Sequence, residues 1–176
     1  MTDLWTDLRS ASRDQLLVRG AALVGALLFT LSFVAAGGGG AVSWTGLVVL
    51  SLLVVVQPHT IAPALFVVFA AASWWVGVDG PWHWALLPAA LGLMLVHVGT
   101  ALAASVPAQA PLPASVLRRW ALRTGVVAAV TVGVWGAAGA LVALATGAGG
   151  AVPGIVGLAL AGGCLVAYLR HVGSSS

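Results

Sequence analysis

Long apolar runs, separated by short polar breaks, occupy most of this chain. About 20 apolar residues in an α-helix cross a hydrocarbon core of roughly 30 Å. Four runs have about this length, and they lie at 18–36, 85–106, 124–146 and 152–169. The pattern therefore predicts an all-α, polytopic membrane protein.

The stretch from 41 to 77 is apolar except for the sequence QPHT near its centre. As one helix it would extend about 55 Å, nearly twice the thickness of the bilayer core. Pro58 removes a backbone donor and disfavours helical geometry at the preceding residue. Thr60 can cap a new helix that tolerates Pro63 in its first turn. We therefore expect about six transmembrane helices, the second and third of which lie at 41–56 and 61–77.

The positions of arginine test this number, because basic residues gather on the cytoplasmic side of a membrane. With six spans and a cytoplasmic N-terminus, all arginines face the cytoplasm and Asp79 faces outward. A single crossing of 41–77 would divide the arginines between the two sides. The distribution therefore predicts that both termini are cytoplasmic. The chain has no Lys and seven Arg: Arg9, Arg13, Arg19, Arg118, Arg119, Arg123 and Arg170.

Three regions are expected along the chain. Residues 1–17 predict an amphipathic cytoplasmic segment on the membrane surface, and Ser12 and Gln15 form a capping-box pattern near its end. The region 18–171 is expected to be a single helical bundle, and 172–176 is a short polar tail. The competing interpretation is a secretory signal cleaved after residue 36, but the apolar run is long for a signal and Asp residues accompany the leading arginines.

Composition narrows the function classes. The chain is 61% apolar and 6% charged, with a mean hydropathy of +1.10, as is typical of an integral membrane protein. The sequence pI of about 10.6 reflects loop arginines, so the expected surroundings are the lipid bilayer and no nucleic acid. Cys164 is the single cysteine, which excludes a disulfide within the chain.

Tryptophans gather at the expected outer ends of the second, third and fourth spans. Indole rings favour the membrane interface, since the ring is apolar while its N–H seeks a polar partner. We expect an aromatic belt there, with a ligand-binding aromatic cage as the alternative. Trp120 and Tyr168 mark the inner boundary. The outer set consists of Trp44, Trp74, Trp75, Trp82 and Trp84.

His97 is the histidine that lies deep in an expected span, which makes it the candidate functional residue within the membrane. Its helical face contains small or mildly polar residues, so we expect this face to turn toward the bundle. The imidazole either bonds to a neighbouring helix or takes part in solute or proton movement. The other residues of this face are Ala90, Met94, Thr100, Ala101 and Ala104.

Catalytic, metal and cofactor sites are not expected. No second histidine lies at the depth of His97 to complete a bis-imidazole haem site. The spans contain no Asp or Glu, and no nucleophile with its base and orienting group can be assembled at one depth. We therefore expect that the protein is not an enzyme.

The loop from Pro107 to Arg123 is the longest hydrophilic connection in the body of the chain. Its prolines limit helix until about Ser115, after which Arg118, Arg119 and Arg123 follow within little more than one turn. These arginines either anchor the fifth span at anionic lipid headgroups or bind an acidic partner. Elsewhere, small residues four apart, such as Gly99 and Ala103, predict close helix packing.

The segments SLLVVVQPHTIAPALFVVFAAASWW and VLRRWALRT together resemble a group of small integral membrane proteins from high-GC actinobacteria. The resemblance covers about a fifth of the chain and implies a multi-pass protein of a bacterial inner cell membrane. Members of that group have no assigned activity and are often encoded near MoxR-type ATPases. The chain is also similar to the substrate-binding subunits of energy-coupling-factor vitamin importers, which have six helices and about this size. Ala22 and Ala26 match the AxxxA pattern with which those subunits meet their partner.

Two functions are therefore expected. The leading one is a non-enzymatic accessory or assembly subunit of a bacterial membrane complex, with other subunits as partners. The alternative is the solute-binding subunit of a small-molecule, vitamin-type transporter. A transporter needs polar residues that converge at one depth, and the chain has few of them within its spans.

Overall fold

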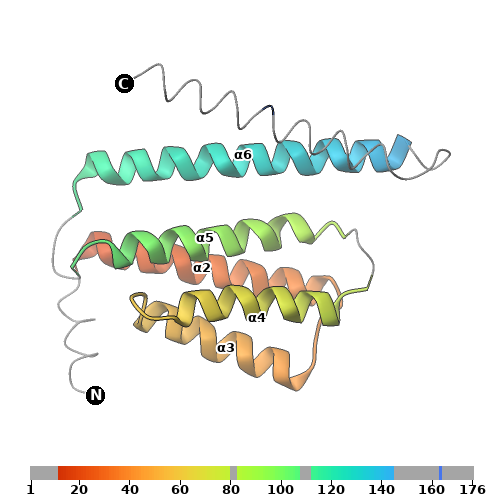
Figure 1. The fold of residues 1–176 in the computed structure, drawn as a ribbon, viewed down its shortest axis with the longest axis horizontal. Coiled ribbons are helices and arrows are strands. Elements are labelled where there is room, and N and C mark those ends of the chain that lie inside the picture. The colour runs from red at the N-terminus through yellow and green to blue at the C-terminus, as the bar shows by residue number, and fades with distance from the viewer. Residues whose placement is uncertain (1–11, 80–82, 108–111, 145–162, 164–176) are drawn as a thin grey trace. The chain divides into compact units, whose positions relative to one another are not determined.

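The computed structural model describes residues 12–79, 83–107, 112–144 and 163. The described residues form α-helices joined by short connections (Figure 1), which confirms the predicted all-α class. The sixth predicted span, 152–169, falls outside the described residues except for residue 163, and so do most of the predicted surface segment 1–17 and the polar tail. The helices are α2 (Arg13–Ala35), α3 (Ala41–Val56), α4 (Ala62–Gly77), α5 (Leu86–Ala104) and α6 (Ala114–Leu144).

The chain divides into two compact units, Met1–Trp120 and Ala121–Ser176. The first contains α2 to α5 and the first turns of α6. Within it, α2 to α5 run alternately in opposite directions (Figure 1), so the start of α2, the α3–α4 connection and the end of α5 lie together. We call this the polar end of the bundle. Asp79, which follows α4, lies at the opposite end.

The polar break at 57–60 is a turn between two helices, as predicted. Gln57 ends α3, and its backbone N–H donates to the Leu53 carbonyl oxygen over 2.7 Å. The Thr60 hydroxyl accepts from the Ala62 backbone N–H at 3.2 Å. Ile61, not Thr60, holds the N-cap position of α4, and Pro63 lies in the first turn, where a missing N–H costs nothing. Local chemistry therefore makes a hairpin of the two helices.

Among the described residues, three helical segments are long and apolar enough to cross a membrane: Arg13–Ala35, Leu86–Ala104 and the Ala114–Gly139 part of α6. This indicates a multi-pass membrane protein. Helices α3 and α4 have 16 residues each. At 1.5 Å per residue each is about 24 Å long, which is shorter than a hydrocarbon core of roughly 30 Å.

Helices α2 and α5 approach closely through glycine. A Cβ atom built on Gly25 would lie 2.6 Å from the Gly92 carbonyl oxygen, and one built on Gly92 would lie 2.6 Å from that of Gly25. Further along, a Cβ on Gly99 would lie 3.3 Å from the Cβ of Ala22. The predicted packing role of Gly99 and Ala103 is confirmed, since both are buried on this face of α5. Small residues let the two backbones meet.

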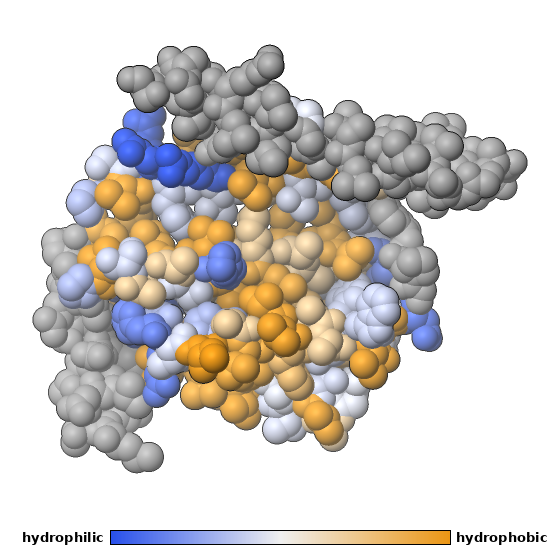
Figure 2. Space-filling view, in the orientation of Figure 1, coloured by the Kyte–Doolittle hydropathy of each residue, from blue (hydrophilic) through white to orange (hydrophobic). Residues whose placement is uncertain are grey.

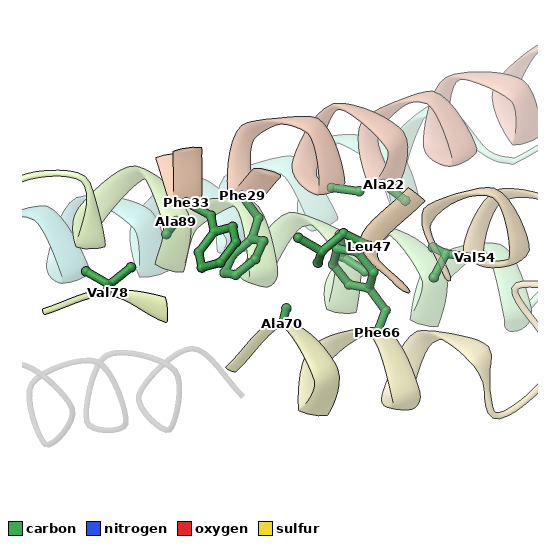
Figure 3. Packing of buried hydrophobic residues seen from close by; sticks show 11 residues of the cluster. Ala22, Phe29, Phe33, Leu47, Val54, Phe66, Ala70, Val78 and Ala89 are labelled. Carbon is green, nitrogen blue, oxygen red and sulfur yellow. The ribbon is translucent and has the colours of Figure 1, made fainter. Parts of the chain in front are cut away.

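Aromatic side chains fill the interior between α2, α3 and α4 (Figure 3). The ring centroid of Phe29 lies 6.2 Å from those of Phe33, Phe66 and Trp74. Phe66 meets Phe29 edge to face, at an interplanar angle of 77°, which is a favourable geometry for two aromatic rings. Leu47 of α3 is fully buried in the same cluster. The core is therefore a packed aromatic and aliphatic cluster.

On the face that Figure 2 shows, apolar residues cover broad areas of the described surface, with hydrophilic patches between them and along its edge. Trp75 is 87% exposed and Trp84 60% exposed, as a lipid-facing belt requires. Trp74 departs from the predicted belt because its ring packs against Phe29 and Phe33. Trp82 lies outside the described residues.

Candidate functional site at the polar end of the bundle

The start of α2 is capped as its sequence predicts. Ser12 is the N-cap, with extended backbone (φ −64°, ψ 157°), and its hydroxyl accepts from the Gln15 backbone N–H at 3.3 Å. The Gln15 side chain, however, reaches a different helix. Its Nε2 donates to the carbonyl oxygens of Ala103, at 3.3 Å, and Val106, at 3.1 Å. Ala103 belongs to the last turn of α5, where helix geometry leaves acceptors without a partner in the helix, and Val106 follows the helix by two residues. Gln15 thus joins the start of α2 to the end of α5.

Asp14 makes the second connection at this end. Its Oδ2 accepts from the backbone N–H of Leu112, just before α6, at 3.2 Å. A carboxylate in the first turn of a helix also interacts favourably with the helix dipole. Beneath these polar contacts, Val18, Ala103 and Leu112 form a small apolar cluster against which Leu117 packs. The polar end therefore combines α2, α5 and the first turns of α6.

Arg19 lies one turn beyond Gln15, on the buried face of α2. Its side chain is 4% exposed, and its Nε and Nη1 have no hydrogen-bond partner in the described part of the chain. The Gln15 Oε1 is likewise buried without a donor. A guanidinium stays charged in proteins, and a buried donor without a partner is costly. Arg19 and Gln15 are therefore the polar groups of the bundle whose bonding is incomplete.

The sequence did not identify this pair as a site. Arg19 was assigned to the cytoplasmic flank of the first span, and Gln15 to a cap. One signal was present: Arg19 falls inside the apolar run 18–36, where an arginine is expensive unless it has a function or a partner. The two residues that Gln15 contacts lie 88 and 91 positions further along the chain. A local sequence pattern does not reveal contacts at such separations.

His97 does not face the described bundle. Its side chain is exposed, while Val96, Gly99 and Thr100 are buried. Within the unit Met1–Trp120 this face therefore does not turn toward α2 to α4, since Ala90, Ala101 and Ala104 are also exposed. The uniform apolarity of α5 gives no contrast between its lipid and bundle faces.

The three candidate arginines of the loop are exposed on α6, which begins at Ala114, close to the predicted start at Ser115. Arg118 and Arg119 follow Leu117 directly and so lie at the polar end of the bundle. The Trp120 indole N–H donates to the carbonyl oxygen of Val98 in α5 at 3.3 Å. Arg123 lies beyond Trp120, in the second unit. The first two arginines thus lie at the same end of the bundle as Asp14 and Gln15.

Five hydroxyl groups within the described helices bond to the backbone of their own helix. Thr30, Ser32, Ser51, Thr100 and Thr131 each donate to the carbonyl oxygen four residues earlier. Among the described residues, no group of three or more His, Cys, Asp or Glu side chains could hold a metal ion. The polar end can therefore bind an ion or headgroup through Arg19 and Gln15, or a surface through Arg118 and Arg119.

Comparison with known proteins finds no family model, no curated protein and no solved structure that matches this chain.

Proposed function

We propose that this chain is a non-enzymatic membrane protein that serves as an accessory or assembly subunit of a bacterial membrane complex. The observation that supports this most is the filled interior. Phe29, Phe33, Phe66 and Trp74 occupy the space between the helices, where a solute-binding protein would need converging polar groups. A bundle of this kind provides packing faces and a stable position in the membrane.

The proposed topology has six spans and both termini in the cytoplasm of a bacterial cell. Arg13, Arg19, Arg118 and Arg119 share the polar end with the α3–α4 turn, while Asp79 lies at the other end. Basic residues that flank transmembrane helices are enriched on the cytoplasmic side of a membrane. This arrangement supports a cytoplasmic polar end.

The alternative, a solute-binding transporter subunit, has less support. Ala22 and Ala26, the AxxxA pair expected to meet a partner subunit, are 1% and 0% exposed inside this bundle. Ala22 packs beside Gly99 of α5. The pair is therefore engaged within the chain and does not offer a surface to a second protein.

Arg118 and Arg119 are the proposed contact with a partner subunit. Both are exposed, and they lie close to each other at the start of α6. Exposed arginines can bind carboxylates with two parallel hydrogen bonds, which suits recognition of an acidic partner. Anionic lipid is the competing ligand, at about 1 kcal/mol for each arginine.

The test is purification from native membranes with quantitative mass spectrometry of copurifying proteins at matched expression. We compare the wild type, the double variant Arg118→Gln/Arg119→Gln, and the control Arg13→Gln, which also removes exposed charge at the polar end. Arg123 stays in place as a topological anchor. We expect the double variant to lose a specific partner that the wild type and Arg13→Gln retain. An unchanged set of proteins in all three would leave these arginines as membrane anchors and contradict the proposed contact.

A further inference from the structure

We propose that Arg19 and Gln15 bind a phosphate group that carries a neighbouring hydroxyl, as in phosphatidylglycerol or dihydrogen phosphate. The two side chains are four residues apart in α2, so they lie on one face of the helix, one turn from each other. Both are at least nine-tenths buried, and both have polar atoms without partners. The proposed site is independent of any partner subunit.

The unpaired atoms define the chemistry of the ligand. Arg19 presents two buried donors, Nε and Nη1, which point to different edges of the guanidinium, and either can donate to a phosphate oxygen. Gln15 presents an acceptor, because its Nε2 is already committed to the Ala103 and Val106 carbonyl oxygens. Since those two oxygens accept only, the orientation of the Gln15 amide is fixed, and Oε1 needs a donor. A ligand that combines anionic oxygens with an O–H group satisfies both residues.

The carboxylates of the described residues do not supply this ligand. Asp14 is five residues before Arg19, which places it about 140° around the helix, and it accepts from Leu112. Asp79 lies at the opposite end of the bundle. An ionised carboxylate also has no proton for Gln15 Oε1. A phosphate with a hydroxyl therefore fits the pair better than an acidic side chain.

The location of Arg19 suits a headgroup. It is six residues from Arg13 at the start of α2, so the Cα of Arg19 lies about 9 Å along the helix axis from the polar end. An arginine side chain can turn toward the membrane interface while its stem stays in apolar surroundings. A phosphate at the cytoplasmic interface can thus meet the guanidinium through rotation of the Arg19 side chain.

The first experiment measures thermal unfolding of the full-length protein in detergent by tryptophan fluorescence. Dihexanoyl-phosphatidylglycerol is titrated against dihexanoyl-phosphatidylcholine, for the wild type, Arg19→Gln and the control Arg13→Gln. Arg13 is exposed on the same helix and carries the same charge. We expect phosphatidylglycerol to raise the Tm of the wild type and of Arg13→Gln, with its affinity reduced about tenfold or more in Arg19→Gln, as loss of a charged hydrogen-bond partner implies.

The stability of Arg19→Gln without phosphatidylglycerol distinguishes a ligand-binding role of Arg19 from a structural role. In phosphatidylcholine alone, Arg19→Gln should be at least as stable as the wild type, because it removes a buried charge that has no partner. If Arg19→Gln is equally destabilised with and without phosphatidylglycerol, Arg19 is a structural residue and the proposal is overturned. An equal response of the wild type and Arg19→Gln to phosphatidylglycerol would overturn it as well.

The second experiment needs no variant and tests the hydroxyl. Dihexanoyl-phosphatidylmethanol has the same phosphodiester charge as phosphatidylglycerol but no O–H group. We expect phosphatidylglycerol to bind the wild type several-fold more tightly, since a net hydrogen bond contributes about 1 kcal/mol. Equal affinities would overturn the role of Gln15. Inorganic phosphate at pH 6 distinguishes the sources: a saturable rise in Tm that competes with phosphatidylglycerol assigns the site to free phosphate as well as lipid. No response to either compound overturns the site.

A third measurement addresses the N-terminal carboxylates, Asp3 and Asp7. In the double variant Asp3→Asn/Asp7→Asn, we expect the response to phosphatidylglycerol to match the wild type. If this variant instead reproduces the full effect of Arg19→Gln in every lipid, the chain's own N-terminus is the partner of Arg19 and the proposal fails.

Discussion

The α2–α5 pair and the α3–α4 hairpin are both antiparallel helix pairs, but different residues bring their helices together. In the α2–α5 pair, Gly25 and Gly92 place backbone against backbone. In the hairpin, a Cβ added at Gly46 of α3 would overlap the ring of Phe69 in α4, so a side chain fills the space beside that glycine. In the α2–α5 pair, the backbone beside Gly25 cannot move aside for an added side chain. In the hairpin, the Phe69 ring beside Gly46 can rotate.

The two pairs also differ in burial. Helix α2 buries nine residues along its length, whereas α3 buries two, Leu47 and Val54. The polar end is fixed by Gln15 and Asp14, both of which belong to α2. The hairpin therefore packs on the outside of a tighter pair, and Phe66 and Trp74 of α4 contact Phe29 of that pair. In a membrane, where apolar burial drives helix association weakly, close backbone contact and fitted side chains decide which pair is the more stable.

The largest expected effect is loss of the contact that holds the hairpin to the tighter pair. Phe66→Ala removes a fully buried ring that meets Phe29 edge to face. We expect a loss of about 3–5 kcal/mol, as for other buried Phe→Ala changes. Trp75→Ala, on the same helix, removes a ring that is 87% exposed and should cost less than about 0.5 kcal/mol. Denaturant titration in detergent micelles measures both, and equal losses would contradict the assigned core.

The next effect compares three glycines that receive the same substitution. Gly25→Ala places a methyl group against backbone and should cost about 3 kcal/mol, whereas Gly46→Ala should cost about 1 kcal/mol because the Phe69 ring can shift. Gly20→Ala meets no atom within 4 Å and should stabilise α2 by up to about 1 kcal/mol. Unfolding of the three variants under one set of conditions gives the order. If Gly46→Ala is more costly than Gly25→Ala, the hairpin is the tighter pair.

The hairpin was predictable from local chemistry, and the α2–α5 pair was not. The boundaries of α3, the turn at 57–60 and the Ser12 cap follow from proline geometry, length and capping, all of which act over a few residues. The contact of Gly25 with Gly92 and the reach of Gln15 to Ala103 depend on how distant helices meet. Small residues are so frequent in this chain that their spacing alone did not identify the pair that meets.

The helix faces could not be predicted because the helices are apolar all round. A soluble protein places polar residues outside, and the contrast identifies the core. Here lipid-facing and buried positions are both apolar, so the same pattern fits either orientation of α5. His97 was assigned to the inner face for its small neighbours, and Trp74 to the outer belt for its position. In the unit Met1–Trp120 the His97 side chain is exposed, and the Trp74 ring packs against Phe29.

The smallest expected effect follows from the exposed position of His97. If the imidazole bonded to a neighbouring helix, His97→Leu would cost about 1 kcal/mol. Since the side chain is exposed, we expect His97→Leu and His97→Asn each to change the free energy of unfolding by less than about 0.5 kcal/mol. The check is equilibrium unfolding of both variants beside the wild type. A loss of unfolding free energy above about 1 kcal/mol in His97→Leu alone would contradict this expectation and indicate a hydrogen bond from His97 to a neighbouring helix.

The proposal that the hairpin crosses the membrane twice and turns in the cytoplasm is tested most directly by cysteine labelling in intact cells. In a Cys164→Ser background, His59→Cys marks the turn and Asp79→Cys marks the opposite end of the bundle. A membrane-impermeant maleimide should label Asp79→Cys at once, and should label His59→Cys only after the cells are permeabilised. Labelling of His59→Cys in intact cells would contradict the cytoplasmic turn and, with it, the six-span topology.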